Sequence, residues 1–127
     1  MSTILVAEDN ANTRRPLVHL LKMAGYQVVT ASNAFEAMAA AHQAEPDLML
    51  LDVSMPPIDG LTLLSRLRET REGADVPVIL VTGLSDELTH RRAQELGVKE
   101  YMVKAQFTPE ELLNRIRAHL NVDSATA

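Results

Sequence analysis

Residues 47–60 of the chain read DLMLLDVSMPPIDG, and this stretch decides the fold. Its apolar run Leu48–Leu51 is typical of a strand buried on both faces, as in a parallel sheet covered by helices. The run stops at Asp52, and two prolines and a glycine then force a loop. Open α/β sheets bind ligands at the carboxyl ends of their strands, which is where Asp52 stands. Solvation of a strand end explains a lone carboxylate equally well, so the rest of the chain has to decide between the two interpretations.

Apolar or β-branched runs alternate with amphipathic stretches along the whole chain. Strands are expected at residues 3–7, 26–30, 48–52, 76–81 and 100–103. Helices are expected between Asn12 and Gly25, from a capping box at Asn33 and Glu36, over about residues 61–71 and 85–96, and from Thr108 onward. This alternation predicts a doubly wound parallel sheet with right-handed crossovers. We expect a single domain over residues 1–127, with a core at about residues 3–121 and a short frayed tail from Val122.

Local features of the helices lead to further expectations. Pro16 falls at the fourth position after Asn12, so the first helix either starts later or has a distorted first turn. The fourth helix has only a thin apolar stripe, formed by Leu88, Ala93 and Leu96. The four histidines stand on four separate helices without metal-ligand spacing and are interpreted as surface or boundary residues. Five methionines are interpreted as filling space in or beside the core: Met23, Met38, Met49, Met55 and Met102.

Composition limits the function before any motif is considered. The chain has 127 residues, of which 46% are apolar and 23% charged, as expected of a globular domain with one core. Its net charge of −5 argues against a nucleic-acid-binding surface, so we expect no nucleic acid partner. Cysteine is absent, which excludes disulfides and thiolate chemistry. No stretch has the form of a signal peptide or the length of a membrane span, so we expect a soluble cytoplasmic protein with no membrane partner.

Every predicted strand but the second ends on polar side chains that can take part in chemistry: Glu8 and Asp9, Asp52, Thr82, and Lys104. Parallel strands share one carboxyl edge, so these side chains should gather there. Neighbouring carboxylates repel one another, and a hard divalent cation such as Mg²⁺ relieves that repulsion through oxygen ligands. With a lysine and a hydroxyl beside them, the acids suit a phosphoryl group that a carboxylate attacks. A structural ion pair between Lys104 and an acid is the alternative, and it is disfavoured because so many strand ends match.

Four motifs at this spacing resemble the receiver domain of two-component response regulators, and the resemblance extends from Ile4 to Leu120. They are the acid pair Glu8-Asp9, Asp52 within D-x-x-M-P-x-x-D-G, Thr82-Gly83, and Tyr101-x-x-Lys104. Each motif alone is weak, whereas the four together are specific. The resemblance implies a flavodoxin-like (βα)5 fold with strand order 2-1-3-4-5.

The resemblance also implies roles in phosphoryl transfer. Asp52 would accept a phosphoryl group from a sensor histidine kinase or a histidine phosphotransfer protein. Asp9, Asp52 and the backbone carbonyl of Ser54 would bind Mg²⁺, or Mn²⁺ in its place, and Glu8 would act on the ion through a water. Lys104 would pair with the phosphoryl oxygens. Such a domain is not an enzyme, apart from catalysing its own phosphorylation and dephosphorylation.

Output in this family passes through a switch. The resemblance implies that Thr82 moves to hydrogen-bond the phosphoryl group and that Tyr101 swings inward with it. The face formed by the fourth helix, fifth strand and fifth helix then changes its affinity for a downstream protein. By the same resemblance, Ser54 and Leu84 would occupy the positions that tune dephosphorylation. The same face permits self-association, so we expect a monomer or a weak dimer.

The sequence departs from the family directly after the lysine. The family usually has proline there, joined by a cis bond, whereas this chain reads Lys104-Ala105-Gln106-Phe107. A cis bond before a residue other than proline costs about 2.5–4 kcal/mol, so we expect a trans Lys104–Ala105 bond and a rebuilt loop.

Other functions fit a sheet of this kind less well. A protein-binding pseudo-receiver that is never phosphorylated is the main alternative, although the acid, hydroxyl and lysine positions are intact. A phosphatase of the haloacid dehalogenase type needs a second aspartate where Ser54 stands. A flavodoxin needs a phosphate-cradling loop where Glu8 and Asp9 would repel phosphate, and no P-loop motif is present.

Overall fold

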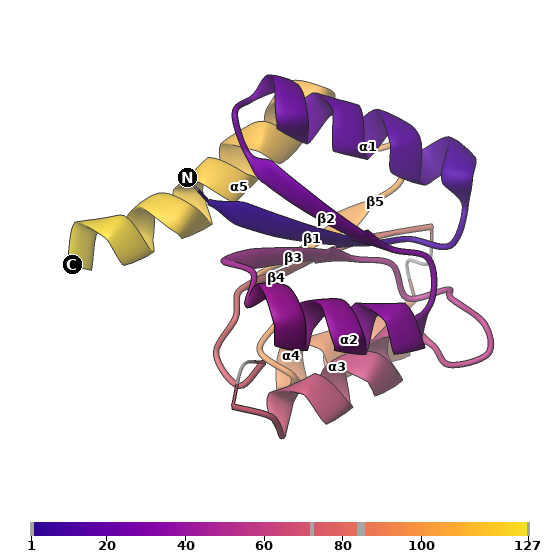
Figure 1. Cartoon of the computed structure of the whole chain (residues 1–127). Helices are drawn as coiled ribbons and strands as arrows, with labels where there is room; N and C mark the ends of the chain where they lie inside the picture. Colours follow the sequence, from indigo (N-terminus) through magenta and orange to yellow (C-terminus); the bar gives the residue numbers. More distant parts are fainter. Residues whose placement is uncertain (1, 72, 84–85, 127) are drawn as a thin grey trace.

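The computed structural model describes residues 2–71, 73–83 and 86–126, and the side chains among them as far as Leu120. Strands and helices alternate along it (Figure 1). The strands are β1 (Thr3–Ala7), β2 (Gln27–Ala31), β3 (Leu48–Leu51), β4 (Val78–Thr82) and β5 (Glu100–Val103). The helices are α1 (Ala11–Met23), α2 (Ala34–Ala44), α3 (Gly60–Arg68), α4 (Glu87–Glu95) and α5 (Pro109–Thr126). Each predicted element is therefore present, with its ends shifted by a few residues.

The strands form one parallel sheet in the order β2-β1-β3-β4-β5. Ala7 at the end of β1 lies opposite Leu51 at the end of β3, and Thr82 lies opposite Val103 in the same way. Figure 1 shows α1 and α5 on one face of the sheet and α2, α3 and α4 on the other. This is the flavodoxin-like doubly wound fold, and the predicted strand order is confirmed.

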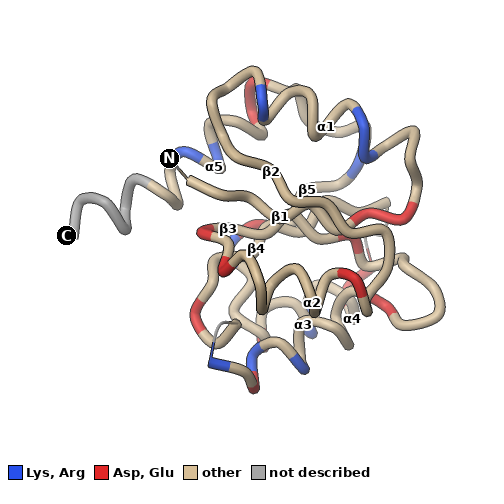
Figure 2. Tube along the Cα trace, viewed as in Figure 1, with Lys and Arg blue, Asp and Glu red and all other residues tan. Residues whose placement is uncertain are grey.

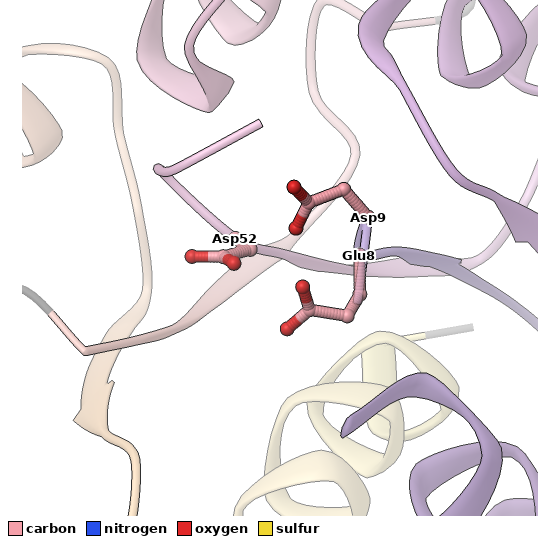
Figure 3. A group of neighbouring side chains, drawn as sticks. All are labelled: Glu8, Asp9 and Asp52. Carbon is pink, nitrogen blue, oxygen red and sulfur yellow. The ribbon is translucent and has the colours of Figure 1, made fainter. Parts of the chain in front are cut away.

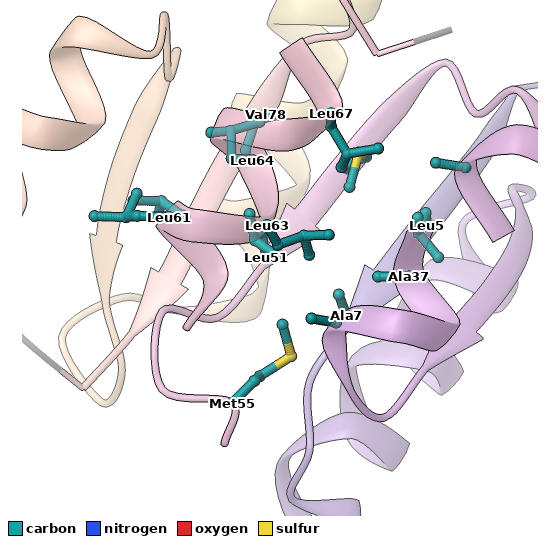
Figure 4. Close-up of a cluster of buried hydrophobic side chains, with 14 of the residues drawn as sticks. Leu5, Ala7, Ala37, Leu51, Met55, Leu61, Leu63, Leu64, Leu67 and Val78 are labelled. Carbon is teal, nitrogen blue, oxygen red and sulfur yellow. The ribbon is translucent and has the colours of Figure 1, made fainter. Parts of the chain in front are cut away.

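The central strand β3 contributes to the core on both faces of the sheet. Met49 and Leu51 pack with the alanines of α2 and the leucines of α3 (Figure 4). Leu48 and Leu50 pack on the other face, with the inner side chains of α1 and α5. All of β3 is buried, as expected for a parallel strand covered by helices on both sides. Packing on two faces therefore fixes the strand that leads into Asp52.

Polar side chains fix where the helices begin. Asn33, Asp59 and Asp86 each accept a hydrogen bond from the backbone N–H three residues later, at 2.7–2.9 Å. Thr108 and Glu111 form the reciprocal capping box predicted for α5. These caps hold the start of each helix against the loop that precedes it.

Helix α1 begins earlier than the sequence predicts. Its N-cap is Asn10 rather than Asn12, and the Asn10 side chain accepts the Asn12 N–H at 2.8 Å. Pro16 therefore lies inside the helix. Because proline has no N–H, the helical bond that would reach the Asn12 carbonyl is missing. The first and second turns of α1 are thus joined by one bond fewer than in an uninterrupted helix.

Two apolar side chains point outward where core positions are expected. Leu88 of α4 is 66% exposed and Met23 of α1 is 75% exposed. Both stand at the end of a helix: Met23 is the last residue of α1 and Leu88 the second residue of α4. The thin stripe of α4 is therefore reduced to buried Ala93 and partly buried Leu96.

Helix α5 runs on to Thr126, although fraying is expected from Val122. Neither proline nor glycine interrupts the chain after Pro109, so nothing in the sequence ends the helix sooner. Within the described ranges, no helix is long and apolar enough to cross a membrane.

Candidate functional site

Three carboxylates meet at the carboxyl edge of the sheet. Glu8 and Asp9 follow β1, and Asp52 follows β3, the strand paired with β1. Each offers an oxygen within 4.8 Å of the others (Figure 3). Glu8 and Asp52 are buried whereas Asp9 is exposed, so solvent reaches the cluster from the Asp9 side. The structure thus brings together the three acids that the sequence places at strand ends.

Lys104 joins these acids from the end of β5. Its Nζ lies 2.6 Å from Glu8 Oε1 and 3.0 Å from Asp52 Oδ2. Burial lowers the pKa of the lysine, but the two carboxylates outweigh this effect and leave the pKa raised. The backbone N–H of Lys104 donates to the Thr82 carbonyl at 2.8 Å, which fixes the lysine to β4. A charged ammonium is therefore held between two buried carboxylates.

Glu8 has a raised pKa. Burial is the main cause and, with the charge of Asp52, raises the pKa from 4.5 to about 7. The ammonium of Lys104 and the backbone N–H of Asn10 act in the opposite direction. Glu8 Oε1 is close to Lys104 but is aligned for no hydrogen bond in the described contacts. A buried oxygen of this kind among other carboxylate oxygens fits a hard divalent cation such as Mg²⁺.

The loop after β3 holds Asp52 in place. Ser54 donates its backbone N–H to Asp52 Oδ1 at 3.2 Å, and Gly60 donates to the Val53 carbonyl at 2.7 Å. Gly60 approaches so close to the Asp52 carbonyl that a Cβ there would collide with it. Met55 is fully buried beneath the loop, near the end of β1 (Figure 4). The methionine and glycine of the D-x-x-M-P-x-x-D-G motif are therefore required by packing around the acid.

The two expected switch residues lie in different places. Thr82 ends β4 at the same sheet edge as the acids and is buried. Tyr101 lies earlier, within β5, and its ring centroid is 4.9 Å from that of His90 on α4. Burial raises the pKa of Tyr101, and the charge of Asp86 adds to the effect. Thr82 is thus part of the site edge, Tyr101 belongs to the contact between α4 and β5, and Leu84 lies outside the described residues.

The loop after Lys104 is rebuilt with a trans bond, as expected. The cis bond in the described chain is Pro56–Pro57, and Lys104–Ala105 is trans. Ala105 has a φ of 67°, in the left-handed region that favours glycine. Gln106 then donates its N–H to the Val103 carbonyl at 3.0 Å, which closes a turn.

Two contacts near the site are missed by the sequence analysis. Arg14 Nη1 donates to the carbonyl oxygens of Glu8 at 2.8 Å and Asp9 at 3.4 Å. His90 is exposed, as the sequence predicts, and its ring also packs on that of Tyr101. Position on a helix places both residues near the site, but the direction of a long or aromatic side chain depends on its rotamer. Nothing in the sequence pattern specifies that direction.

Comparison with known proteins adds evidence that is independent of the geometry. The family model of the response regulator receiver domain matches residues 4–117. The "Probable transcriptional regulator ycf27" of Guillardia theta is 43% identical over 117 residues, which cover 92% of this chain and 44% of that protein. The "DNA-binding dual master transcriptional regulator RpaA" of Synechocystis is 36% identical over 120 residues, covering 94% of this chain and 49% of that protein. The chain therefore spans about half the length of the curated relatives it matches.

A solved structure agrees with this assignment along the whole chain. It is a CheY-like response regulator receiver domain protein from Methanospirillum hungatei, with a TM-score of 0.92 and 25% sequence identity. The match covers 100% of this chain and 99% of the other.

The expectation of no nucleic acid partner is wrong. It rests on the net charge of −5, yet the matched relatives are transcriptional regulators, and one of them is DNA-binding by name. A charge argument describes the surface of this chain only. It does not apply to the other half of proteins that are about twice as long.

Proposed function

Because this chain belongs to the response regulator receiver domain family, we propose that Asp52 accepts a phosphoryl group in signalling. The donor is the phosphohistidine of a sensor histidine kinase or of a histidine phosphotransfer protein. An Asp52 oxygen bonds to phosphorus as the phosphorus–nitrogen bond breaks, and the released imidazole takes up a proton. Water later attacks the same phosphorus, the bond from phosphorus to the Asp52 oxygen breaks, and inorganic phosphate leaves as the carboxylate is restored. Receiver domains are signalling modules, and both steps are self-catalysed rather than the turnover of an external substrate.

The arrangement of Asp52 and Lys104 carries this proposal. The Asp52 carboxylate is buried but lies 3.0 Å from Lys104 Nζ, at an edge that solvent reaches beside Asp9. The lysine neutralises the oxygens of an incoming phosphoryl group, while Thr82 offers them a hydroxyl donor. As the phosphoryl group arrives, Lys104 therefore exchanges its ion pair with the Asp52 carboxylate for one with the phosphoryl oxygens.

The acid cluster supports a requirement for Mg²⁺, with Mn²⁺ as a substitute. Asp9, Asp52 and the backbone carbonyl of Ser54 would hold the ion, and Glu8 would act through a water. A bound divalent ion neutralises phosphoryl oxygens and relieves the repulsion among the acids. The gathering of three carboxylates, two of them buried, favours this assignment.

Output would pass through Thr82, Tyr101 and the face formed by α4, β5 and α5. Residues 3–121 would act as one receiver unit in this switch. The relatives are transcriptional regulators about twice as long as this chain. We therefore infer that its signal reaches nucleic acid through an effector region or partner, not through the receiver surface itself.

Mass spectrometry after incubation with Mg²⁺ and acetyl phosphate or phosphoramidate tests the proposal. The parent chain should gain the mass of one phosphoryl group, and Asp52→Asn should abolish the gain. Asp75→Asn is the matched control, because Asp75 is an exposed aspartate outside the acid cluster. No gain in the parent chain, or a gain that survives Asp52→Asn, would favour a protein-binding module that works without phosphorylation.

A further inference from the structure

Arg14 lies beside the acid cluster and bonds to the backbone that carries it. Its Nη1 donates to the carbonyl oxygens of Glu8 at 2.8 Å and Asp9 at 3.4 Å. These two residues supply two of the three clustered carboxylates. We propose that Arg14 is a positioning residue that sets the loop between β1 and α1 for divalent-cation binding. The proposal rests on the proposed role of the acids as cation ligands.

The loop between β1 and α1 is held by a short network of hydrogen bonds. The Asn10 N–H donates to Glu8 Oε2 at 3.1 Å, and the Asn12 N–H donates to Asn10 Oδ1 at 2.8 Å. The backbone N–H of Arg14 donates to the Asn10 carbonyl at 2.8 Å. The Arg14 guanidinium closes this network from the helix side by holding the carbonyl of each acid. It therefore constrains the orientation of the two peptide units from which the acid side chains project.

Pro16 makes this tether more important. The helical bond that would reach the Asn12 carbonyl is missing, and it would have joined the first turn of α1 to the second. The first turn is thus held less firmly by the rest of the helix, and the Arg14 side chain ties this turn to the loop instead. Without it, the acid side chains would sample more orientations and lose more conformational freedom when an ion binds. Ligands that are ordered in advance bind more tightly, because less of that freedom remains to be lost.

A purely electrostatic role for Arg14 predicts the opposite effect on cation affinity. Helix α1 carries Arg14, Arg15 and Lys22 and no acidic residue, so it is positively charged along its length (Figure 2). A positive charge near the acids repels a divalent cation, and its removal alone would strengthen cation binding. Loss of a positioning contact would instead weaken it. The sign of the change therefore separates the two roles.

The test measures Mg²⁺ affinity by titration calorimetry and free Mn²⁺ by electron paramagnetic resonance, on the full chain without a phosphodonor. Arg14→Gln should bind Mg²⁺ about tenfold more weakly, in the range found for residues that orient metal ligands. The ammonium of Arg14→Lys can still donate to one of the two carbonyls, so this variant should keep part of the positioning contact and bind with an affinity between those of Arg14→Gln and the parent chain. Arg15→Gln is the matched control, since Arg15 is exposed, carries the same charge and makes no bond to the loop among the described residues. It should bind Mg²⁺ as tightly as the parent chain or slightly more tightly.

Amide hydrogen exchange adds a readout that cation affinity alone does not give. Both Arg14 variants should show faster exchange of the Asn10 N–H with unchanged helix content by circular dichroism. Unchanged or tighter Mg²⁺ binding by folded Arg14→Gln would overturn the proposal, and so would equal weakening by Arg15→Gln. If Arg14→Gln does not fold, Arg14→Lys decides by the same criterion. If the parent chain binds no Mg²⁺, the proposed metal site fails and this proposal fails with it. If the parent chain binds Mg²⁺ and Arg14→Gln binds it as tightly, the role of Arg14 fails alone.

Discussion

Two partly buried cations stand at opposite edges of the sheet and have different partners. At the carboxyl edge, Lys104 lies between the carboxylates of Glu8 and Asp52. Before the start of β4, at the amino edge, the guanidinium of Arg68 donates at 2.7–2.9 Å to the backbone carbonyls of Gly73, Val76 and Leu96. The first cation is therefore surrounded by charge and the second by neutral dipoles.

The pKa directions follow from these partners. The two carboxylates raise the pKa of Lys104, whereas burial lowers the pKa of Arg68 against the attraction of Asp75. A cation among carboxylates can exchange partners when a metal ion or a phosphoryl group enters. A cation among backbone carbonyls has no such alternative, and it joins the loop before β4 to the end of α4. Both cations are partly buried, so the difference between them comes from their partners rather than from their burial.

Lys104→Met should give the largest effect. Phosphoryl uptake from acetyl phosphate should slow by about a hundredfold, because the transferring oxygens lose their cation. Arg68→Met is the matched control and should change this rate by about twofold or less, since Arg68 lies outside the site. The rate of mass gain at saturating Mg²⁺ checks both. Equal slowing in the two variants would contradict the distinction between the edges.

Arg68→Met should act on stability instead. Its free energy of unfolding should fall by about 3 kcal/mol, since buried carbonyls lose their donors at about 1–3 kcal/mol each. Arg68→Lys should recover part of the loss, because one ammonium reaches fewer of the carbonyls. Urea unfolding measures all three chains. If Arg68→Met has the same free energy of unfolding as the parent chain, water replaces the guanidinium as the donor to these carbonyls.

Glu8 should make stability depend on pH. Its raised pKa means that the folded chain holds the Glu8 proton more tightly than the unfolded chain between pH 4.5 and about 7. The stability from this group is complete below pH 4.5 and is lost as the pH rises through 7, by at most about 3 kcal/mol. Urea unfolding across this range should show the loss in the parent chain and a flatter profile in Glu8→Gln. Identical profiles in the two chains would contradict the assignment.

The contact of His90 with Tyr101 should give the smallest effect. His90→Ala should lower the free energy of unfolding by roughly 0.5–1 kcal/mol, and His90→Phe should keep most of it by keeping a ring. The chain has two tyrosines and no tryptophan, so Tyr26→Phe leaves Tyr101 as the reporter of fluorescence quenching. Quenching by acrylamide should rise in His90→Ala and not in His90→Phe. Equal quenching in both variants would show that the ring contact does not shield Tyr101.

The fold and the acid cluster could be predicted because they depend on patterns along the backbone. An apolar run ending on Asp52 specifies a buried strand and the edge where it stops, and Glu8 and Lys104 follow the same rule. Parallel pairing then brings these strand ends together, so their proximity can be predicted without knowing any side-chain rotamer. The loop glycine and methionine are recognisable for the same reason, since they fill fixed backbone positions.

The remaining features depend on side-chain direction or on competition between neighbours. Asn10 and Asn12 are equally good caps in sequence, and the structure uses the first. Leu88 fits an apolar stripe, but it stands in the first turn of α4 and is exposed. Arg14 and Arg68 reach backbone carbonyls through long flexible side chains, and no periodicity describes such contacts.

Under the proposed function, the left-handed conformation of Ala105 bears on how long a phosphoryl group would stay on Asp52. That conformation costs a residue with a Cβ about 1 kcal/mol, and glycine avoids the cost. Glycine also makes the unfolded chain more flexible, which destabilises the folded chain by a similar amount, about 0.5–1 kcal/mol. Ala105→Gly would therefore leave the melting temperature almost unchanged while loosening the peptide that follows Lys104. In the proposed function, a substitution at this position would change the lifetime of the phosphoryl group without any trace in thermostability.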